Sequence, residues 1–419
     1  MKTTLTFLAF LLTVCTVAEA QVVPEATGPG LPVHGNLRYD LRYSETSEIG
    51  GSLDGQQRSF ASGDASYAND SERLPFSMQY GGGYAWTWAG PPEAGGVYQH
   101  LSLTQGIVGR SWNLRASDNV GYTFETPTTG FSGVPGSGEP IGVSGSTTPP
   151  DQTVLVLNTR TLDNFTTLAA GHRFDYATSL NVGGSAGQLY YLDNNGLNTD
   201  MLMADAGITR RLDARNSVAG QYSFSRFSYG GAGSASSANA AQLSFSQVNT
   251  AQFSFTRKWN RHIHSSVSAG PQWISSSNSA IVPSSTRIAA SASVSDTFRA
   301  GTASLSYSHG AQGGSGYYLG AESDVASANF SRRLGRSWNA GLTASYMRTA
   351  GLNGNGVTNG KYAGAQAGRS LGRDFNIFAN YTAMFQSSSS TLSTNALSGL
   401  TQVIGFGIGY SPRGIHLRH

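Results

Sequence analysis

The chain has little of what soluble enzymes and helical membrane proteins commonly depend on. One of its 419 residues is a cysteine, Cys15, so the sequence excludes intrachain disulfides and cysteine-based metal centres. After the N-terminal region, no apolar run approaches the roughly 20 residues of a membrane-spanning helix. Charged residues make up 12% of the chain, about half of the usual share.

Lysine is also scarce, since Lys2, Lys258 and Lys361 are the only lysines among 27 basic residues. The net charge of +3 comes without any basic run, which excludes the usual footprint of a nucleic-acid-binding protein. Glycine is abundant, with 53 residues, and aromatic residues reach 11%. This composition suits a transmembrane β-barrel, and it also suits a secreted sandwich or a solenoid.

The N-terminus predicts export through the general secretory route. Lys2 is followed by an apolar run over 5–17 and by Ala-Glu-Ala at 18–20, the order of a secretory signal peptide spanning 1–20. A lipoprotein would need Cys15 as its lipid-bearing residue, but the valine before it fits that processing poorly. Cleavage would remove Cys15 and leave 21–35, with its three prolines, as a short periplasmic leader.

The stretch RRLDARNSVAGQYSFSRFSYG, residues 210–230, shows the pattern that dominates the rest of the chain. Alternate residues of a strand point to opposite faces. One face here is apolar and the other is small and polar, which predicts a strand but fits a soluble sheet with one wet face equally well. The apolar parity holds Val218, Gly220, Tyr222 and Phe224, and the polar parity holds Ala219, Gln221, Ser223 and Ser225.

A repeated hairpin favours the membrane barrel. Short turns built around Asp, Asn or Gly, flanked by Arg and an aromatic residue or leucine, recur near positions 175, 213, 260, 300, 335 and 372. Between them lie longer segments rich in Gly, Ser and Asn. Outer-membrane barrels have short periplasmic turns and long external loops. A propeller, the soluble alternative, would need four short strands in each repeat of similar length.

The alternation predicts an all-β, up-and-down antiparallel barrel of eighteen strands over 36–410, with sixteen strands as the alternative and a tail over 411–419. Aromatic residues near the turns predict two girdles at the membrane interfaces. Near the short turns these are Trp112, Phe174, Trp259, Phe298, Trp338 and Phe375, and near the long loops they are Tyr43, Trp86, Trp88, Phe124, Tyr229, Trp273, Tyr307 and Tyr346.

The stretch GFGIGY places Gly405, Ile408 and Tyr410 at the spacing of the C-terminal assembly signal of outer-membrane barrels. Here the chain resembles the broad class of Gram-negative outer-membrane β-barrels, porins included. The resemblance implies an outer-membrane location, contact with lipid and lipopolysaccharide, and insertion by a barrel assembly machinery. The chain departs from this signal in two ways. Val403 occupies the position that is polar in the signal, and residues 411–419 follow Tyr410, although the signal ends the chain at its aromatic residue.

The polar parity of the strands would line the lumen, and a few charges on it are candidate pore-lining residues. Rings of charge inside a pore set its ion preference, so these residues form a candidate selectivity element. Ion pairing within the wall, or simple wetting by lumen water, is the alternative. The candidates are Arg38, Asp40, Arg42, Arg115, Asp205 and Arg287.

The longest connection, 125–152, would be the third external loop. In many porins this loop folds into the barrel and narrows it, which makes Glu125, Glu139 and Asp151 candidate constriction residues. The richness of the segment in glycine and proline favours instead a mobile external loop.

The sequence gives little support for catalysis, a metal or a cofactor. His262 and His264 share a strand face beside a turn and offer two metal ligands, but no third ligand is evident nearby, so a solvated pair is the preferred interpretation. We therefore expect a non-enzyme with no cofactor.

We expect a porin-like channel for passive diffusion of small polar or saccharide-like solutes. One alternative is a conduit that exports polysaccharide or another polymer with periplasmic partner proteins. Another is a plugged barrel with a structural or adhesive role. A homo-oligomer is compatible with the sequence, but nothing in it identifies a subunit interface.

Overall fold

The computed structural model describes residues 37–51, 55–69, 71–89, 96–124, 130–131, 134–135, 160–192, 198–230, 245–313, 318–354, 356–389 and 398–415. The predicted signal peptide and leader lie outside these ranges. No helix within them is long and apolar enough to cross a membrane.

Eighteen long strands form one closed antiparallel sheet, which confirms the predicted strand number and fold class. The ring closes where β1 pairs with β20, with Leu41 opposite Tyr410. β5 pairs directly with β8, because β6 and β7 form a separate two-stranded hairpin between them. The strands are β1 (Leu37–Ile49), β2 (Gln57–Asn69), β3 (Phe76–Ala89), β4 (Gly96–Val108), β5 (Trp112–Phe124), β6 (Gly130–Phe131), β7 (Val134–Pro135), β8 (Arg160–Arg173), β9 (Thr178–Tyr191), β10 (Asn198–Arg211), β11 (Asn216–Gly230), β12 (Phe245–Lys258), β13 (Ile263–Ser276), β14 (Ser285–Phe298), β15 (Gly301–Gln312), β16 (Ala321–Leu334), β17 (Trp338–Gly351), β18 (Val357–Leu371), β19 (Phe375–Ser388) and β20 (Gly399–Tyr410).

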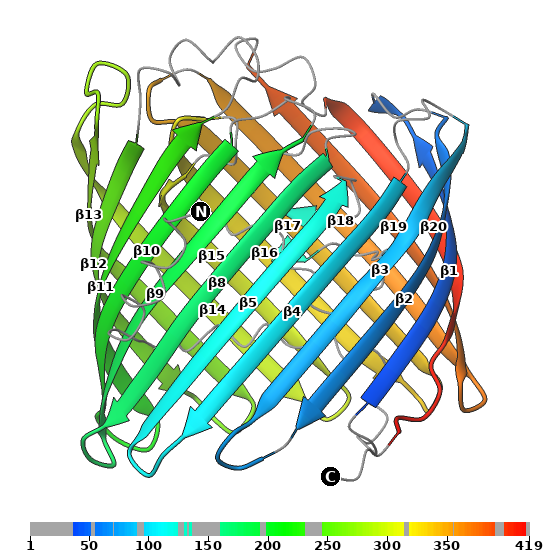
Figure 1. Ribbon diagram of the computed structural model, residues 1–419, viewed down its shortest axis with the longest axis horizontal. Coiled ribbons are helices and arrows are strands. Elements are labelled where there is room, and N and C mark those ends of the chain that lie inside the picture. The colour runs from blue at the N-terminus through cyan, green and yellow to red at the C-terminus, as the bar shows by residue number, and fades with distance from the viewer. Residues whose placement is uncertain are drawn as a thin grey trace, which may run out of the picture.

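Short and long connections alternate along the chain. The connections 174–177 and 299–300 are short, whereas 277–284 and 313–320 are longer. Because neighbouring strands are antiparallel, the short turns gather at one end of the barrel, drawn at the bottom of Figure 1, and the long connections gather at the other. These are called the short-turn end and the long-loop end below. β1 begins and β20 ends at the short-turn end.

Three of the short turns have the same pattern of side-chain to backbone hydrogen bonds. Asp175 Oδ1 accepts the backbone N–H groups of the residues two and three positions on, at 2.6 and 2.7 Å. Asp213 and Asn260 accept the equivalent N–H groups at 2.6–2.9 Å. A short carboxyl or amide side chain that bonds to the backbone ahead of it favours a tight turn. This explains why Asp or Asn recurs there.

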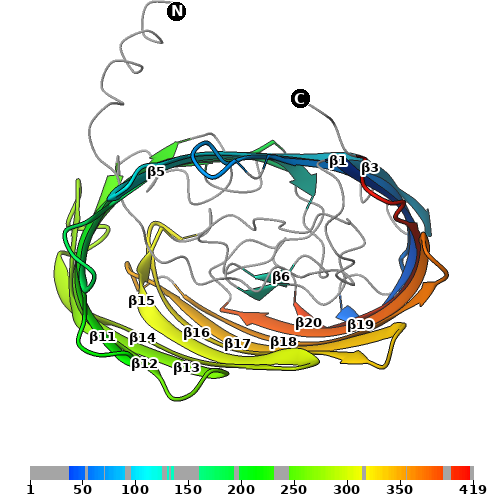
Figure 2. The ribbon, with the colours of Figure 1, turned by 90° about the horizontal axis from the view of Figure 1, so that it is seen from below.

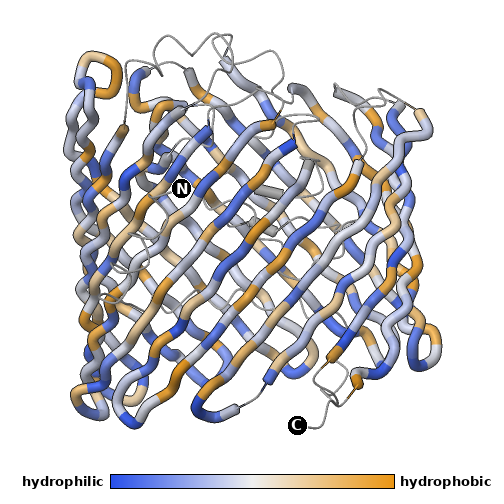
Figure 3. Tube along the Cα trace, in the orientation of Figure 1, coloured by the Kyte–Doolittle hydropathy of each residue, from blue (hydrophilic) through white to orange (hydrophobic). Residues whose placement is uncertain are grey.

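The two faces of the wall differ as the alternation predicts, and Figure 3 shows polar and apolar residues alternating along the strands. On the outer face Ile288 is 65% exposed and Leu305 is 60% exposed. On the luminal face Thr382 and Met384 are buried. A barrel with its large apolar side chains outside and small or buried ones inside is suited to a hydrocarbon solvent.

The aromatic residues expected at the girdles lie on the outer face, with Tyr229 as an exception. Trp112 and Trp259 are exposed near the short-turn end, and Trp273 and Tyr346 are exposed near the long-loop end. The assignment of Tyr229 to the outer girdle was wrong, because its side chain is buried on the luminal side. The side chain of Phe124 lies outside the described part of the structure.

The cause is a change in pattern near the end of β11. Arg226 occupies an outward position, where its guanidinium carbon lies 4.2 Å from the centre of the Phe245 ring. Phe227 and Tyr229 therefore take inward positions. They belong to an apolar cluster inside the barrel at the long-loop end, which we call the luminal cluster: Met201, Phe227, Tyr229, Val248, Ile274, Val282, Leu319 and Leu352.

Candidate functional site: the barrel lumen

On β13–β16 the lumen toward the short-turn end is lined by small hydroxyl side chains that hydrogen-bond across neighbouring strands. Ser266 and Ser293 lie 2.7 Å apart, oxygen to oxygen, and Ser268 and Ser291 lie 2.8 Å apart. Two further pairs link β15 to β16: Thr302 with Ser331, and Ser306 with Ser327. These paired hydroxyls keep further acceptor capacity, so they form a neutral polar surface for water or a solute.

The three candidate charges on β1 occupy inward positions, where Asp40 is directly opposite Asp64 of β2. The Ser411 hydroxyl of the tail donates a hydrogen bond to Asp40. Arg42 interacts electrostatically with the Asp64 carboxylate. Arg38 is half-buried near the short-turn end. Wall interactions therefore engage at least two of these charges, and their role in selectivity stays a prediction.

The other three candidate charges also occupy inward positions, on separate parts of the wall. Arg115 is exposed near the short-turn end of β5. Asp205 lies midway along β10, where Gln221 Nε2 donates to Oδ2 at 3.4 Å. Arg287 forms an ion pair with Glu322 of β16. The six candidates thus do not form one ring of charge.

Toward the long-loop end the luminal side chains are buried around the ring. Ser44 Oγ, Thr46 Oγ1 and Thr401 Oγ1 are buried and make no hydrogen bond within the described structure. Three described connections also place apolar side chains in this half of the lumen, through Val282, Leu319 and Leu352. The buried polar residues here include Ser44, Thr46, Thr161, Thr199, Ser246, Thr250, Ser323, Thr349, Thr358, Thr382, Gln386 and Thr401.

Sequence reasoning missed a buried ion pair in this half. Glu48 and Arg58 are diagonal neighbours in the first hairpin, where Thr46 is the residue opposite Arg58. They are 3% and 1% exposed and lie 3.5 Å apart from Oε1 to Nε. Arg58 Nη2 also donates to Gln56 Oε1 at 2.7 Å. Glu48 shares its parity with the inward residues of β1, so the alternation could have placed it in the lumen. Its burial could not have been found that way.

The β6–β7 hairpin belongs to the segment expected to narrow the pore. Seen along the barrel axis in Figure 2, β6 lies inside the oval of the wall. The candidate constriction residues Glu125, Glu139 and Asp151 lie outside the described residues, so their role stays a prediction.

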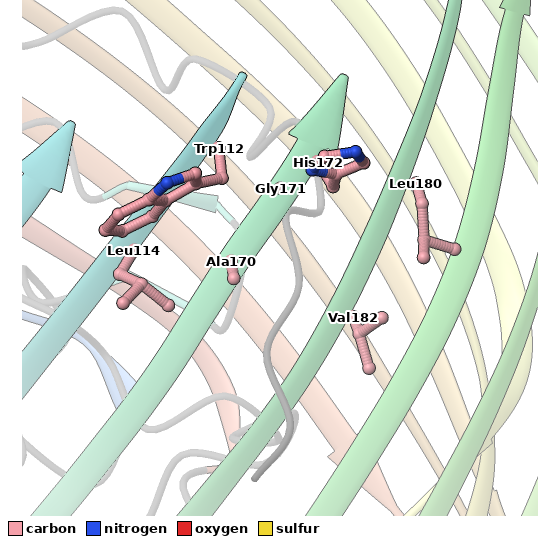
Figure 4. A pocket seen from close by; sticks show the side chains of 7 residues that line it. All are labelled: Trp112, Leu114, Ala170, Gly171, His172, Leu180 and Val182. Atoms are coloured by element: carbon pink, nitrogen blue, oxygen red, sulfur yellow. The ribbon is translucent and has the colours of Figure 1, made fainter. Parts of the chain in front are cut away.

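A shallow groove on the outer face lies near the short-turn end of β5, β8 and β9. Small residues of β8, Ala170 and Gly171, form its floor between Trp112 and Leu180 (Figure 4). The His172 ring meets the Phe174 ring edge-on at 4.9 Å beside it. Because the groove opens on the outer face, it is not a site on the path through the lumen.

Asp118 lies near the middle of β5 on the outer face, opposite Leu103 and Thr166. Its Oδ1 accepts hydrogen bonds from Thr166 Oγ1 at 2.6 Å and from Asn164 Nδ2 at 3.2 Å. Charge on the lipid face of a barrel is costly. The two hydrogen bonds reduce that cost.

The remaining candidates have ordinary surroundings. His262 Nδ1 lies 2.7 Å from the Thr297 carbonyl oxygen, and no group of three acidic, His or Cys side chains able to hold a metal occurs among the described residues. Tyr410 ends β20 with its ring 5.1 Å from that of Phe375. Gly405 is inward, because an added Cβ would meet the Asn380 side chain. The assembly role of Gly405, Ile408 and Tyr410 stays a prediction.

No protein family and no curated protein matches the chain. Among solved structures, it resembles OccK2 (OpdF) from Pseudomonas aeruginosa at 9% identity and a TM-score of 0.44, over 91% of this chain and 100% of that one. OccAB4 from Acinetobacter baumannii gives 8% identity and 0.44, over 90% and 97%. OpdK from Pseudomonas aeruginosa with vanillate gives 8% and 0.44, over 90% and 98%. At this level the likeness adds nothing to the fold, which the strand pairings establish.

Proposed function

We propose that the protein is an outer-membrane channel for passive diffusion of small polar solutes of the saccharide class. The observation that carries the proposal is the neutral surface of paired hydroxyls on the luminal face of β13–β16, inside a closed barrel of eighteen strands. A barrel of this size encloses an aqueous space unless protein fills it. Because outer-membrane barrels have their short turns on the periplasmic side, the short-turn end would face the periplasm.

The chemistry of the lining supports a neutral, hydroxylated solute. Serine and threonine hydroxyls both donate and accept hydrogen bonds, so they replace the water around a sugar hydroxyl without selecting for charge. Arg115 near the short-turn end supplies one exposed positive charge.

The burial of luminal side chains toward the long-loop end favours a second candidate, a plugged barrel with a structural role. In that case the residues of the luminal cluster would be a permanent core. The two candidate functions differ in one respect. In a channel the luminal cluster must move to open the path, whereas in a plugged barrel it must stay in place.

Single-channel recording of the folded protein in a planar bilayer tests the proposal. We expect steady openings that added oligosaccharide blocks, and vesicles that swell in small sugars but not in large ones. Arg115→Glu should shift the reversal potential in a salt gradient toward cation preference, and Arg115→Gln should shift it less. Silence of the wild-type protein at every voltage would reject the channel and support the plugged barrel.

A further inference from the structure

Two neighbouring strands of the wall separate at the long-loop end. β14 and β15 pair from Phe298 and Gly301 up to Ala290 and His309, where the ladder ends. β14 continues to Ser285 along β13, and β15 continues to Gln312 along β16. Residues 285–289 therefore have a strand partner on one side only within the described structure.

The end of β15 lies on the luminal side of β13, which is two strands away in the sheet. The Ala311 backbone N–H donates to Gln272 Oε1 at 2.8 Å, and Gln272 Nε2 donates to the Ala311 carbonyl at 3.3 Å. The Tyr229 hydroxyl donates to the Gly313 carbonyl at 3.0 Å. Side chains of β11 and β13 thus bind backbone groups at the end of β15, where β14 no longer pairs with it.

An ion pair between β14 and β16 fits the position of the β15 end inside the wall. Arg287 occupies an inward position on β14 and Glu322 an outward position on β16, yet the two side chains pair. They meet because the ends of β15 and β16 lie inside β14. Glu322 Oε1 is also 3.4 Å from His309 Nε2, so the polar contacts extend to the residue where the two strands part.

We propose that the long-loop ends of β15 and β16, residues 310–313 and 318–323, move together with the end of β17 that is paired with β16. They form a flap with two alternative positions, an inner seat and an outer seat. The inner seat is the one described above. In the outer seat, β15 continues its ladder along β14 in the same register, which would pair Ala289 with Gly310 and Ile288 with Ala311. An added Cβ at Gly310 would lie 3.7 Å from the Ala289 Cβ, so these two positions are already close to each other.

Both seats satisfy the backbone of β15, which is the condition for a two-state element. In the inner seat the partners are side chains, and in the outer seat they are the backbone groups of β14. The inner seat buries Leu319 against Val282 and Leu352, so it is the resting state. Because it fills the lumen, movement to the outer seat widens the path. This gating role rests on the proposed channel function.

Disulfide trapping of the full protein in lipid vesicles tests the flap. The double variant Ile288→Cys/Ala311→Cys joins two positions that oppose each other only in the outer seat. Ser291→Cys/Ser308→Cys joins a pair already opposed in the ladder and serves as the positive control. We expect both variants to form a linked peptide under mild copper-catalysed oxidation, the control faster. Gln272→Ala should speed linkage of the first variant several-fold, and Gln252→Ala, a luminal amide of β12, should not.

The outcomes separate the flap from the channel. Linkage of the control without linkage of Ile288→Cys/Ala311→Cys would overturn the flap, whatever the protein conducts. If the linked variant forms and its single-channel conductance rises on oxidation and falls again on reduction, the gate is supported. Linkage with unchanged conductance in a conducting protein overturns the gating role. Linkage in a protein that never conducts rejects the channel and leaves a flap that moves without gating.

Discussion

At the scale of single residues, the tight turns depend on side chains that bind the backbone ahead of them. The backbone N–H groups of Ala177 and Thr178 hold the pKa of the Asp175 carboxyl below its usual value. The Asn216 side chain, together with nearby backbone N–H groups, does the same for the pKa of Asp213. Both carboxyls therefore stabilise the folded turn more strongly when they are ionised than when they are protonated.

This linkage predicts an acid-sensitive stability. A carboxyl whose pKa is lower in the folded state contributes stability above its unfolded pKa, near 4, and loses that contribution as the pH falls through the folded value. We expect wild type to exceed Asp175→Asn/Asp213→Asn in urea midpoint at pH 7, and the gap to close below about pH 4.

Asn260→Ala is the matched control, because it removes the same kind of turn hydrogen bonds from a residue that does not titrate. Its loss of stability should be the same at pH 7 and pH 3. A gap between wild type and the double Asn variant that persists at pH 3 would show that charge plays no part in these turns.

At the scale of elements, single strands carry two kinds of luminal surface. β13 presents Ser266 and Ser268 toward the short-turn end but Ile274 toward the long-loop end. β11 likewise passes from Gln221 and Ser223 to buried aromatic rings. Each strand therefore contributes a wet segment and a packed segment to the same face.

A pair of isoleucines separates packing from lipid exposure. Ile274 is 3% exposed in the luminal cluster, whereas Ile288 is 65% exposed on the outer face. Ile274→Ala should cost about 2–5 kcal/mol of unfolding free energy, since it leaves a cavity in packed protein. Ile288→Ala should cost clearly less, because lipid replaces the lost atoms.

The measurement is the urea midpoint of each variant in the same lipid, followed by gel mobility before and after heating. Equal losses for the two variants would mean that the luminal cluster is not a packed core. The result would then count against the inner seat of the flap as well.

At the scale of the whole molecule, the barrel places its most exposed apolar side chains on the outside and its hydroxyls inside. Leu305 and Val294 face each other on the outer surface of β14 and β15, while their neighbours Ser304 and Ser295 face each other across the inner surface. A soluble sheet of this size would bury the first set. The orientation of the whole wall fits a membrane solvent.

Adjacent substitutions on β15 test that orientation. Leu305→Arg should cost about 2–4 kcal/mol, the usual penalty for arginine on the lipid face near the middle of a barrel. Ser304→Arg should cost much less, because the added charge reaches the polar lumen. The comparison uses the urea midpoint of refolding into vesicles, and equal penalties would contradict the assigned faces.

The sequence alone determined the strand number, the alternation of short and long connections, and the two faces of most strands. These features follow from local rules, because alternation fixes which side chains share a face and Asp or Asn fixes a tight turn. The repeat of hairpins then leaves an up-and-down barrel as the consistent arrangement.

Only the tertiary structure decided how the lumen is filled. Parity places Arg287 inward but cannot show that Glu322 meets it, because that contact requires β15 and β16 to lie inside β14. Parity also cannot tell a wet luminal position from a buried one. Tyr229 was misplaced for another reason, because it was assigned from its nearness to a long loop although it shares the inward parity of Gln221 and Ser223. Such contacts depend on segments that fold back across the barrel, and no local period records them.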